Sequence, residues 1–234
     1  MLSAAVLWSC EGDDQSNVTA DRGGKNKVPR TTLQLDTARP APKPQPKPKP
    51  VRPAKIEEPE PAGPDTAITV HNYCDSISGG SAKSDTTRII DIIVIHSSYY
   101  ADVDSFYIRG ILDEYEAYGV SAHYLIGRDG TIYRLVPEND ISFHAGKSML
   151  PADPSRTALN ANSIGIEVVN TETNGPTVKQ YDALVRLVNN IRARRDIRYI
   201  YRHSDIAPGR KTDPWQFDWQ NFLERLNFEN PQKE

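Results

Sequence analysis

The residues best suited to chemistry lie in segment 203–215, near the C-terminus. His203 and Asp213 are ten positions apart there. Pro208, Gly209 and Pro214 predict that the segment is not a regular helix, and Gly209 permits a tight bend. The bend can bring both side chains to one ion. A third ligand, His96, ends an apolar run. Two nitrogen ligands and one oxygen ligand suit Zn²⁺ and leave a fourth position for water. That arrangement is typical of a hydrolytic metal site.

Two further side chains could take part in such chemistry. Glu167 lies within the apolar run 163–170, where a buried carboxylate is costly unless it has a role or a partner. It could serve as a general base and then as a proton donor, or it could form a salt bridge to an arginine. Lys211, two positions before Asp213, could stabilise an oxyanion or could be a solvated surface lysine. We expect the functional role for both.

The other candidates also have structural alternatives. A single histidine is more often a hydrogen-bonded structural residue than a ligand, and Asp213, which precedes Pro214, could cap a turn. His123 and His144 could line the substrate groove or support a sheet, and we place them at the groove. Neither is expected to bind the metal.

The surrounding sequence alternates between strand and helix patterns. A β-branched run precedes His96, Asp129-Gly130 predicts a hairpin turn, and Thr177 is suited to cap an amphipathic helix. This alternation predicts an α/β domain with a mixed central β-sheet flanked by helices. The expected strands cover 88–97, 123–126, 131–136, 163–170 and 198–202, and the expected helices cover 105–118, a segment after Thr177, and 219–226.

Composition divides the chain of 234 residues into three parts. Ten of the 18 prolines fall between Pro40 and Pro64, so we expect a disordered linker rich in proline and lysine over residues 11–85. The folded domain is expected over residues 86–230. A net charge of −3 argues against nucleic acid as a partner, and two cysteines are too few for a disulfide scaffold.

The first ten residues are apolar and end at Cys10, and acidic residues follow. This pattern resembles the end of a bacterial lipoprotein signal, with a lipid attached to Cys10. It departs from such signals because it has no basic segment and its apolar run is short. The alternative is a short apolar terminus without a role. No run in the sequence approaches the roughly 18 apolar residues of a spanning helix.

Several motifs, in this order along the chain, resemble those of a known protein family. Over residues 88–215 the chain resembles the type-2 family of zinc-dependent N-acetylmuramoyl-L-alanine amidases, which are relatives of the peptidoglycan recognition proteins. The motifs are Ile-Val-Ile-His96, Ser-Ala-His123-Tyr-Leu-Ile-Gly-Arg-Asp-Gly, Phe-His144-Ala-Gly, Asn162-Ser-Ile-Gly-Ile-Glu167 and His203-Ser-Asp-Ile-Ala-Pro-Gly-Arg-Lys211-Thr-Asp213-Pro.

The resemblance implies one Zn²⁺ ion held by His96, His203 and Asp213, with Glu167 as acid and base and Lys211 as stabiliser of the tetrahedral intermediate. Some relatives carry a tyrosine before the middle histidine, where this chain has alanine. The implied reaction is hydrolysis of the amide between N-acetylmuramic acid and L-alanine in peptidoglycan or muropeptides.

Two other functions compete with this one. The first is a module that binds peptidoglycan without cutting it. The second is a zinc protease, which is disfavoured because the chain has no His-Glu-x-x-His motif. A lipid on Cys10 would place the domain in the periplasm, tethered to the outer membrane.

Overall fold

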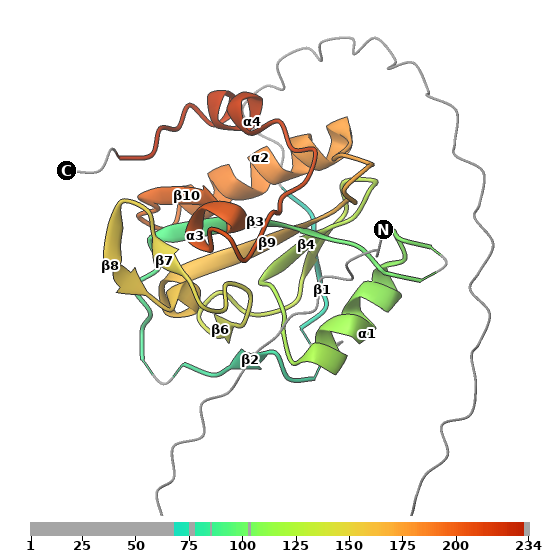
Figure 1. The fold of residues 1–234 in the computed structure, drawn as a ribbon, viewed down its shortest axis with the longest axis horizontal. Coiled ribbons are helices and arrows are strands. Elements are labelled where there is room, and N and C mark those ends of the chain that lie inside the picture. The colour runs from blue at the N-terminus through green and yellow to red at the C-terminus, as the bar shows by residue number, and fades with distance from the viewer. Residues whose placement is uncertain (1–67, 75–77, 85, 103, 232–234) are drawn as a thin grey trace, which may run out of the picture. The chain divides into compact units, whose positions relative to one another are not determined.

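The computed structural model describes residues 68–74, 78–84, 86–102 and 104–231. They contain a six-stranded mixed sheet with helices on both faces, which confirms the predicted α/β class (Figure 1). The predicted lipoprotein signal, its Cys10 and residues 11–67 of the predicted linker lie outside the described residues.

The order of strands in the sheet is β1-β5-β4-β9-β3-β10. The β4–β5 pair is antiparallel, and the other four pairs are parallel. Nearly every residue of β3 and β9 is buried, which explains their rich content of isoleucine and valine. The strands are β1 (Val70–Asn72), β5 (Ile132–Arg134), β4 (Tyr124–Ile126), β9 (Ser163–Val169), β3 (Ile92–Ser98) and β10 (Tyr199–Arg202).

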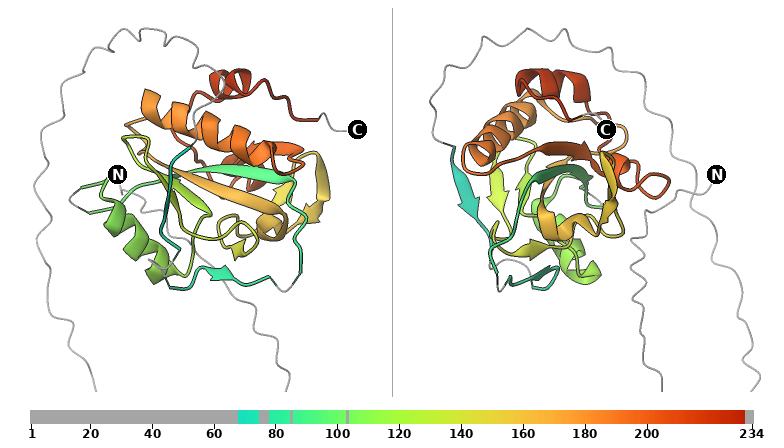
Figure 2. Two further views of the ribbon diagram at one scale, coloured as in Figure 1. Left: turned by 180° about the vertical axis from the view of Figure 1, so that it is seen from behind. Right: turned by 90° about the vertical axis from the view of Figure 1, so that its left-hand side faces the viewer.

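Three helices cover the sheet. α2 (Val178–Arg192) and α4 (Trp219–Arg225) lie on one face, and α1 (Ile108–Tyr118) lies on the other (Figures 1 and 2). α2 packs its buried stripe against Ile164, Ile166 and Val168 of β9. The opposite face of the same strand therefore carries Gly165 and Glu167, because side chains alternate along a strand.

Local signals in the sequence fix several boundaries as predicted. Thr177 accepts a hydrogen bond from the Gln180 backbone N–H, and the Gln180 side chain accepts one from Thr177, so both residues cap α2. Gly119 ends α1 with φ of 63°, and Gly130 turns the β4–β5 hairpin with φ of 85°. Both angles suit glycine because it has no Cβ.

The folded domain begins earlier than residue 86. β1 pairs with β5 in the main sheet, and β2 (Ser81–Ala82) pairs with β6 (Ile141–Ser142). The linker predicted to reach residue 85 therefore extends too far. These strands have two or three residues, which is too short for an alternating pattern to be recognised.

Segment 203–215 also differs from its prediction. It begins with one helical turn, α3 (His203–Ile206), which Asp205 caps by accepting a hydrogen bond of 3.0 Å from the Arg202 backbone N–H. The helix stops there because Pro208 and Gly209 follow. The remaining short elements are β7 (Met149–Leu150), β8 (Asp153–Thr157) and the 3₁₀ helix η1 (Leu159–Asn162). Within the described residues, no helix combines the length and apolar character required to cross a bilayer.

A buried carboxylate ties the turn after β5 to the end of α2. Glu138 accepts hydrogen bonds from Arg194 at 2.9 Å, Arg195 at 2.7 Å and the Tyr124 hydroxyl at 2.7 Å. Burial alone would raise the pKa of Glu138, but these donors, led by Arg194, lower it to about 2.

We therefore predict that Glu138 stabilises the fold only while it is ionised. A lowered folded-state pKa gives stability that is complete above about pH 4.5 and is lost as pH falls toward 2. Replacing Glu138 by Gln should cost on the order of 3 kcal/mol at pH 7 and much less near pH 2. Urea unfolding of both proteins across this range measures the difference. A cost that does not change with pH would contradict the prediction.

Candidate metal centre

Three of the predicted site residues meet at one end of the sheet. His96, His203 and Asp213 each offer a ligand atom, and these atoms lie within 4.8 Å of one another. His96 is near the end of β3, and His203 follows the adjacent parallel strand β10. Parallel strands end at the same edge of a sheet, which explains how residues 107 positions apart come together.

Backbone contacts hold the Asp213 loop against these strands. The Asp213 carbonyl oxygen accepts a hydrogen bond from the Ser204 N–H at 2.9 Å, and its Oδ2 accepts one from the Ser97 N–H at 3.4 Å. The same Oδ2 lies 3.1 Å from Nδ1 of His203 and 3.6 Å from Nδ1 of His96. The three side chains are therefore arranged around one point.

The electrostatics of the cluster match those of a metal site. Burial, together with the neighbouring His203, lowers the pKa of His96 to about 4. Burial opposes ionisation of Asp213, but His203 and His96 hold its pKa well below the ordinary value. A neutral imidazole and an ionised carboxylate are the forms that bind metal. His96 Nδ1 is buried and has no hydrogen-bond partner among the described residues. This donor set fits Zn²⁺.

Glu167 stands beside the cluster because of strand register. Residue 167 of β9 is paired with residue 96 of β3, and Glu167 Oε1 lies 3.9 Å from His96 Nδ1. The Ser98 hydroxyl donates to Glu167 Oε2 at 2.7 Å, so the Tyr115 hydroxyl, 2.5 Å from Ser98 Oγ, donates to Ser98. Burial, together with the nearby Asp213, raises the pKa of Glu167 to about 8.

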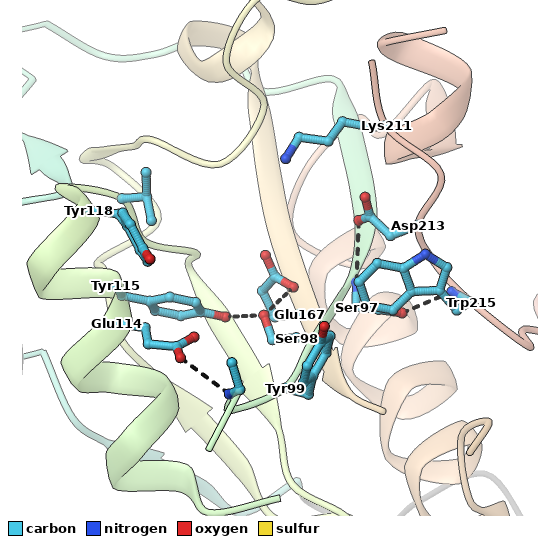
Figure 3. Close-up of a pocket in the computed structure, with 12 residues that line it drawn as sticks. Ser97, Ser98, Tyr99, Glu114, Tyr115, Tyr118, Glu167, Lys211, Asp213 and Trp215 are labelled. Carbon is cyan, nitrogen blue, oxygen red and sulfur yellow. Dashed lines mark hydrogen bonds between the residues drawn. The ribbon is translucent and has the colours of Figure 1, made fainter. Parts of the chain in front are cut away.

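A cavity of about 150 Å³ opens over these groups (Figure 3). The Lys211 side chain extends into it above Glu167, and Tyr115 and Tyr118 come from α1 on the opposite side. The candidate general base, the candidate cation and the aspartate ligand thus face one space. The lining residues are Ser97, Ser98, Tyr99, Ala101, Glu114, Tyr115, Tyr118, Val120, Glu167, Lys211, Asp213 and Trp215.

His123 and His144 do not reach that space. Both are buried and are absent from the cavity lining. His123 Nδ1 accepts a hydrogen bond from the Gly165 N–H at 3.0 Å, and His144 Nδ1 lies 3.0 Å from His96 Nε2. The structure does not bring either histidine to this cavity, and our placement of both at the substrate groove stays a prediction. The geometry of the structure supports the alternative, in which they support the sheet.

Sequence reasoning missed Ser98 and Tyr115. Ser98 follows His96 by two positions, so both point to the same face of β3, and this spacing could have identified it. Tyr115 gave no such signal. It belongs to the apolar stripe of α1 with Ile111 and Leu112, and a tyrosine in such a stripe is read as core.

The family profile for N-acetylmuramoyl-L-alanine amidase (Amidase_2) matches residues 85–216, more than half of the chain. The chain belongs to this family. The match spans every candidate ligand together with Glu167 and Lys211.

Two sequence relatives illustrate the match. The 1,6-anhydro-N-acetylmuramyl-L-alanine amidase AmpD of Enterobacter cloacae is 42% identical over 106 residues, which are 44% of this chain and 55% of that protein. The N-acetylmuramoyl-L-alanine amidase AmiD of Escherichia coli K12 is 34% identical over 155 residues, 58% of this chain and 53% of that protein. The chain thus spans about half the length of each.

Solved structures share the fold. A crystal structure of a selenomethionine AmpD derivative has a TM-score of 0.57 at 30% identity and covers 69% of this chain and 96% of that one. Escherichia coli AmiD, in complex with its substrate anhydro-N-acetylmuramic acid-L-Ala-D-γ-Glu-L-Lys, has a TM-score of 0.51 at 29% identity. That match covers 62% of this chain and 65% of AmiD.

The contacts of Glu167 lead to a prediction for the metal-free chain. The Ser98 hydrogen bond stabilises the ionised carboxylate and so lowers the pKa of Glu167. Replacing Ser98 by Ala should therefore raise that pKa above its wild-type value. A ¹³C NMR titration of the Glu167 carboxyl in both metal-free proteins measures the change. An unchanged or lower pKa in the variant would refute this role for Ser98.

Proposed function

We propose that the chain is a zinc-dependent amidase that hydrolyses the amide between N-acetylmuramic acid and L-alanine in peptidoglycan or its fragments. The observation that carries this proposal is the buried His96–His203–Asp213 cluster with Glu167 beside it in an open cavity. Family membership supports it, as do relatives that are named as amidases of this bond.

His96, His203 and Asp213 would hold the Zn²⁺ ion. When bound, the ion would polarise the scissile carbonyl and lower the pKa of a bound water toward roughly 7. The protein itself must then move one proton and stabilise one negative charge.

Glu167 is placed to move that proton. Its Oε2 is engaged by Ser98, which leaves Oε1 on the side of the ligand cluster. Oε1 takes a proton from the attacking water, and the carboxyl then gives it to the departing amine of L-alanine. The new C–O bond forms during the attack, and the C–N bond breaks when the tetrahedral oxyanion collapses, so the products are a muramic acid carboxylate and a free stem peptide. A carboxyl whose pKa is raised by burial suits both steps.

Lys211 is placed to stabilise the oxyanion that forms during attack. It is mostly buried, its ammonium faces the cavity that Glu167 and Asp213 line, and a cation in such a site acts more strongly than one in water. The aromatic side chains of Tyr99, Tyr118 and Trp215 form a further part of the wall. They offer apolar surface to a sugar ring or a stem peptide.

We also propose that a lipid on Cys10 and the proline-rich segment after it tether the domain in the periplasm, at the outer membrane. The support is the apolar run before Cys10 and the acidic residues after it. Metabolic labelling with a palmitate analogue tests this proposal, with Cys10→Ala as the control. Equal labelling of both proteins would refute lipid attachment at Cys10.

The proposed reaction can be tested directly with the full chain. Purified peptidoglycan and anhydro-muropeptides are incubated with the protein, with a chelator, and with the chelator followed by Zn²⁺. Mass spectrometry should find free stem peptides beginning with L-alanine, lost with the chelator and restored by zinc. Wall that is bound and left uncut would instead indicate a binding module.

Replacing Glu167 by Gln should keep the metal and lower kcat about 10²–10⁴-fold, the usual contribution of a general acid–base group. Zinc content and turnover are measured on the same preparation. The exposed Glu172, replaced by Gln, is the matched control and should retain full activity. Normal turnover in the Glu167 variant would remove it from the mechanism.

Replacing Asp213 by Ala should abolish tight zinc binding. In the wild type, free Zn²⁺ at 100 times Kd should stabilise the fold by about 2.7 kcal/mol, because it binds only the folded chain. Elemental analysis and thermal unfolding with added zinc test both statements. The exposed Asp153, replaced by Ala, provides the comparison. A variant that is stabilised by zinc as strongly as the wild type would exclude Asp213 as a ligand.

A further inference from the structure

A chain of buried hydrogen bonds leads away from the metal cluster on the side opposite the cavity. His96 Nε2 lies 3.0 Å from His144 Nδ1, and His144 Nε2 lies 3.0 Å from Ser163 Oγ. Ser163 Oγ in turn lies 2.6 Å from the carbonyl oxygen of Leu159. His96, His144 and Ser163 are each at most 1% exposed. The chain is therefore closed to water and ends on a backbone carbonyl.

That carbonyl fixes the direction of every proton in the chain. A carbonyl oxygen can only accept, so Ser163 must use its single hydroxyl proton on Leu159. Ser163 Oγ is then an acceptor for His144 Nε2–H. Among the described residues, no acidic side chain contacts His144, and a buried charge without a partner is costly, so its ring is neutral. Its Nδ1 therefore accepts the proton of His96 Nε2.

We infer that His144 and Ser163 are positioning residues that hold His96 in the tautomer protonated on Nε2, so that the Nδ1 lone pair points to the metal. This inference rests on the proposed zinc site. Nδ1 is the atom of His96 that lies 3.6 Å from Asp213 and has no hydrogen-bond partner among the described residues. A bond from the second ring nitrogen of a ligand commonly sets its orientation and raises its basicity.

Two features hold His144 in place. Asn160 Oδ1 accepts hydrogen bonds from the backbone N–H groups of His144 at 3.1 Å and Ala145 at 2.8 Å. The imidazole ring lies against Gly165 of β9, where a Cβ would overlap the ring atoms. Gly165 thus leaves the space that the ring occupies. The motif that carries Glu167 therefore also contains Gly165, the residue against which the His144 ring packs.

The first test is made on the wild-type full chain without metal. Two-dimensional ¹H–¹⁵N NMR of the imidazole nitrogens distinguishes protonated from unprotonated positions. His96 and His144 should both be protonated on Nε2 and unprotonated on Nδ1. A His96 ring protonated on Nδ1, or a mixture of tautomers, would overturn the inference without any substitution.

The second test compares zinc affinity by competition with a chelator. Replacing Ser163 by Ala removes the acceptor for His144, and zinc affinity should fall roughly 10–100-fold. Replacing Gly165 by Ala displaces the ring without removing a polar group and should weaken zinc binding as well. The control is Ser142→Ala, which removes another buried hydroxyl, one bonded to the Ser121 carbonyl at 2.9 Å. It should leave zinc affinity unchanged.

The outcomes separate this inference from the proposed function. If the wild type binds zinc and cuts muropeptides but the Ser163 variant binds zinc equally well, only the positioning role is wrong. If the wild type does not bind zinc, the proposed function fails, and the positioning role falls with it. The NMR result still reports whether the hydrogen-bond chain has the proton order derived above.

Discussion

The parallel pairing of β3 with β9 is the constraint on which the rest of the site depends. Its register places His96 beside Glu167, and a shift of β3 by a single residue would turn His96 to the opposite face, away from Glu167. The register is held because the other face carries Ile93, Ile95 and the isoleucines of β9 against α2. The hydrophobic layer under α2 thus sets the position of the polar groups above it.

The site is built from two kinds of contact that meet at His96. On the cavity side, ionisable groups with displaced pKa values face each other across a few ångströms. On the interior side, the neutral side chains of His144 and Ser163 form a chain of hydrogen bonds with a fixed donor and acceptor order, and this chain ends on the Leu159 carbonyl. One side can take part in chemistry because it is open, and the other gives a stable orientation because it is closed. Both would be needed for a histidine that is to bind a metal in one geometry.

Much of this arrangement was predictable from the sequence, and the rest was not for identifiable reasons. The β-branched run before His96, the Thr177 cap and the Asp-Gly turn carry local signals, and the structure contains each element. The strands before residue 86 are too short to show the alternation of polar and apolar residues by which a strand is recognised in a sequence. The surroundings of His144 could not be predicted, because it contacts Ser163 and Gly165 only after folding.

The order of the ligands along the chain has a consequence for assembly. His96 lies on a central strand, whereas His203 and Asp213 follow β10, which lies at an edge of the sheet and comes after every other strand of the described residues. During synthesis the chain carries one ligand for more than one hundred residues before the other two emerge. The three candidate ligands therefore come together only after β10 has docked, so capture of a metal by this cluster would report that this edge of the sheet has closed.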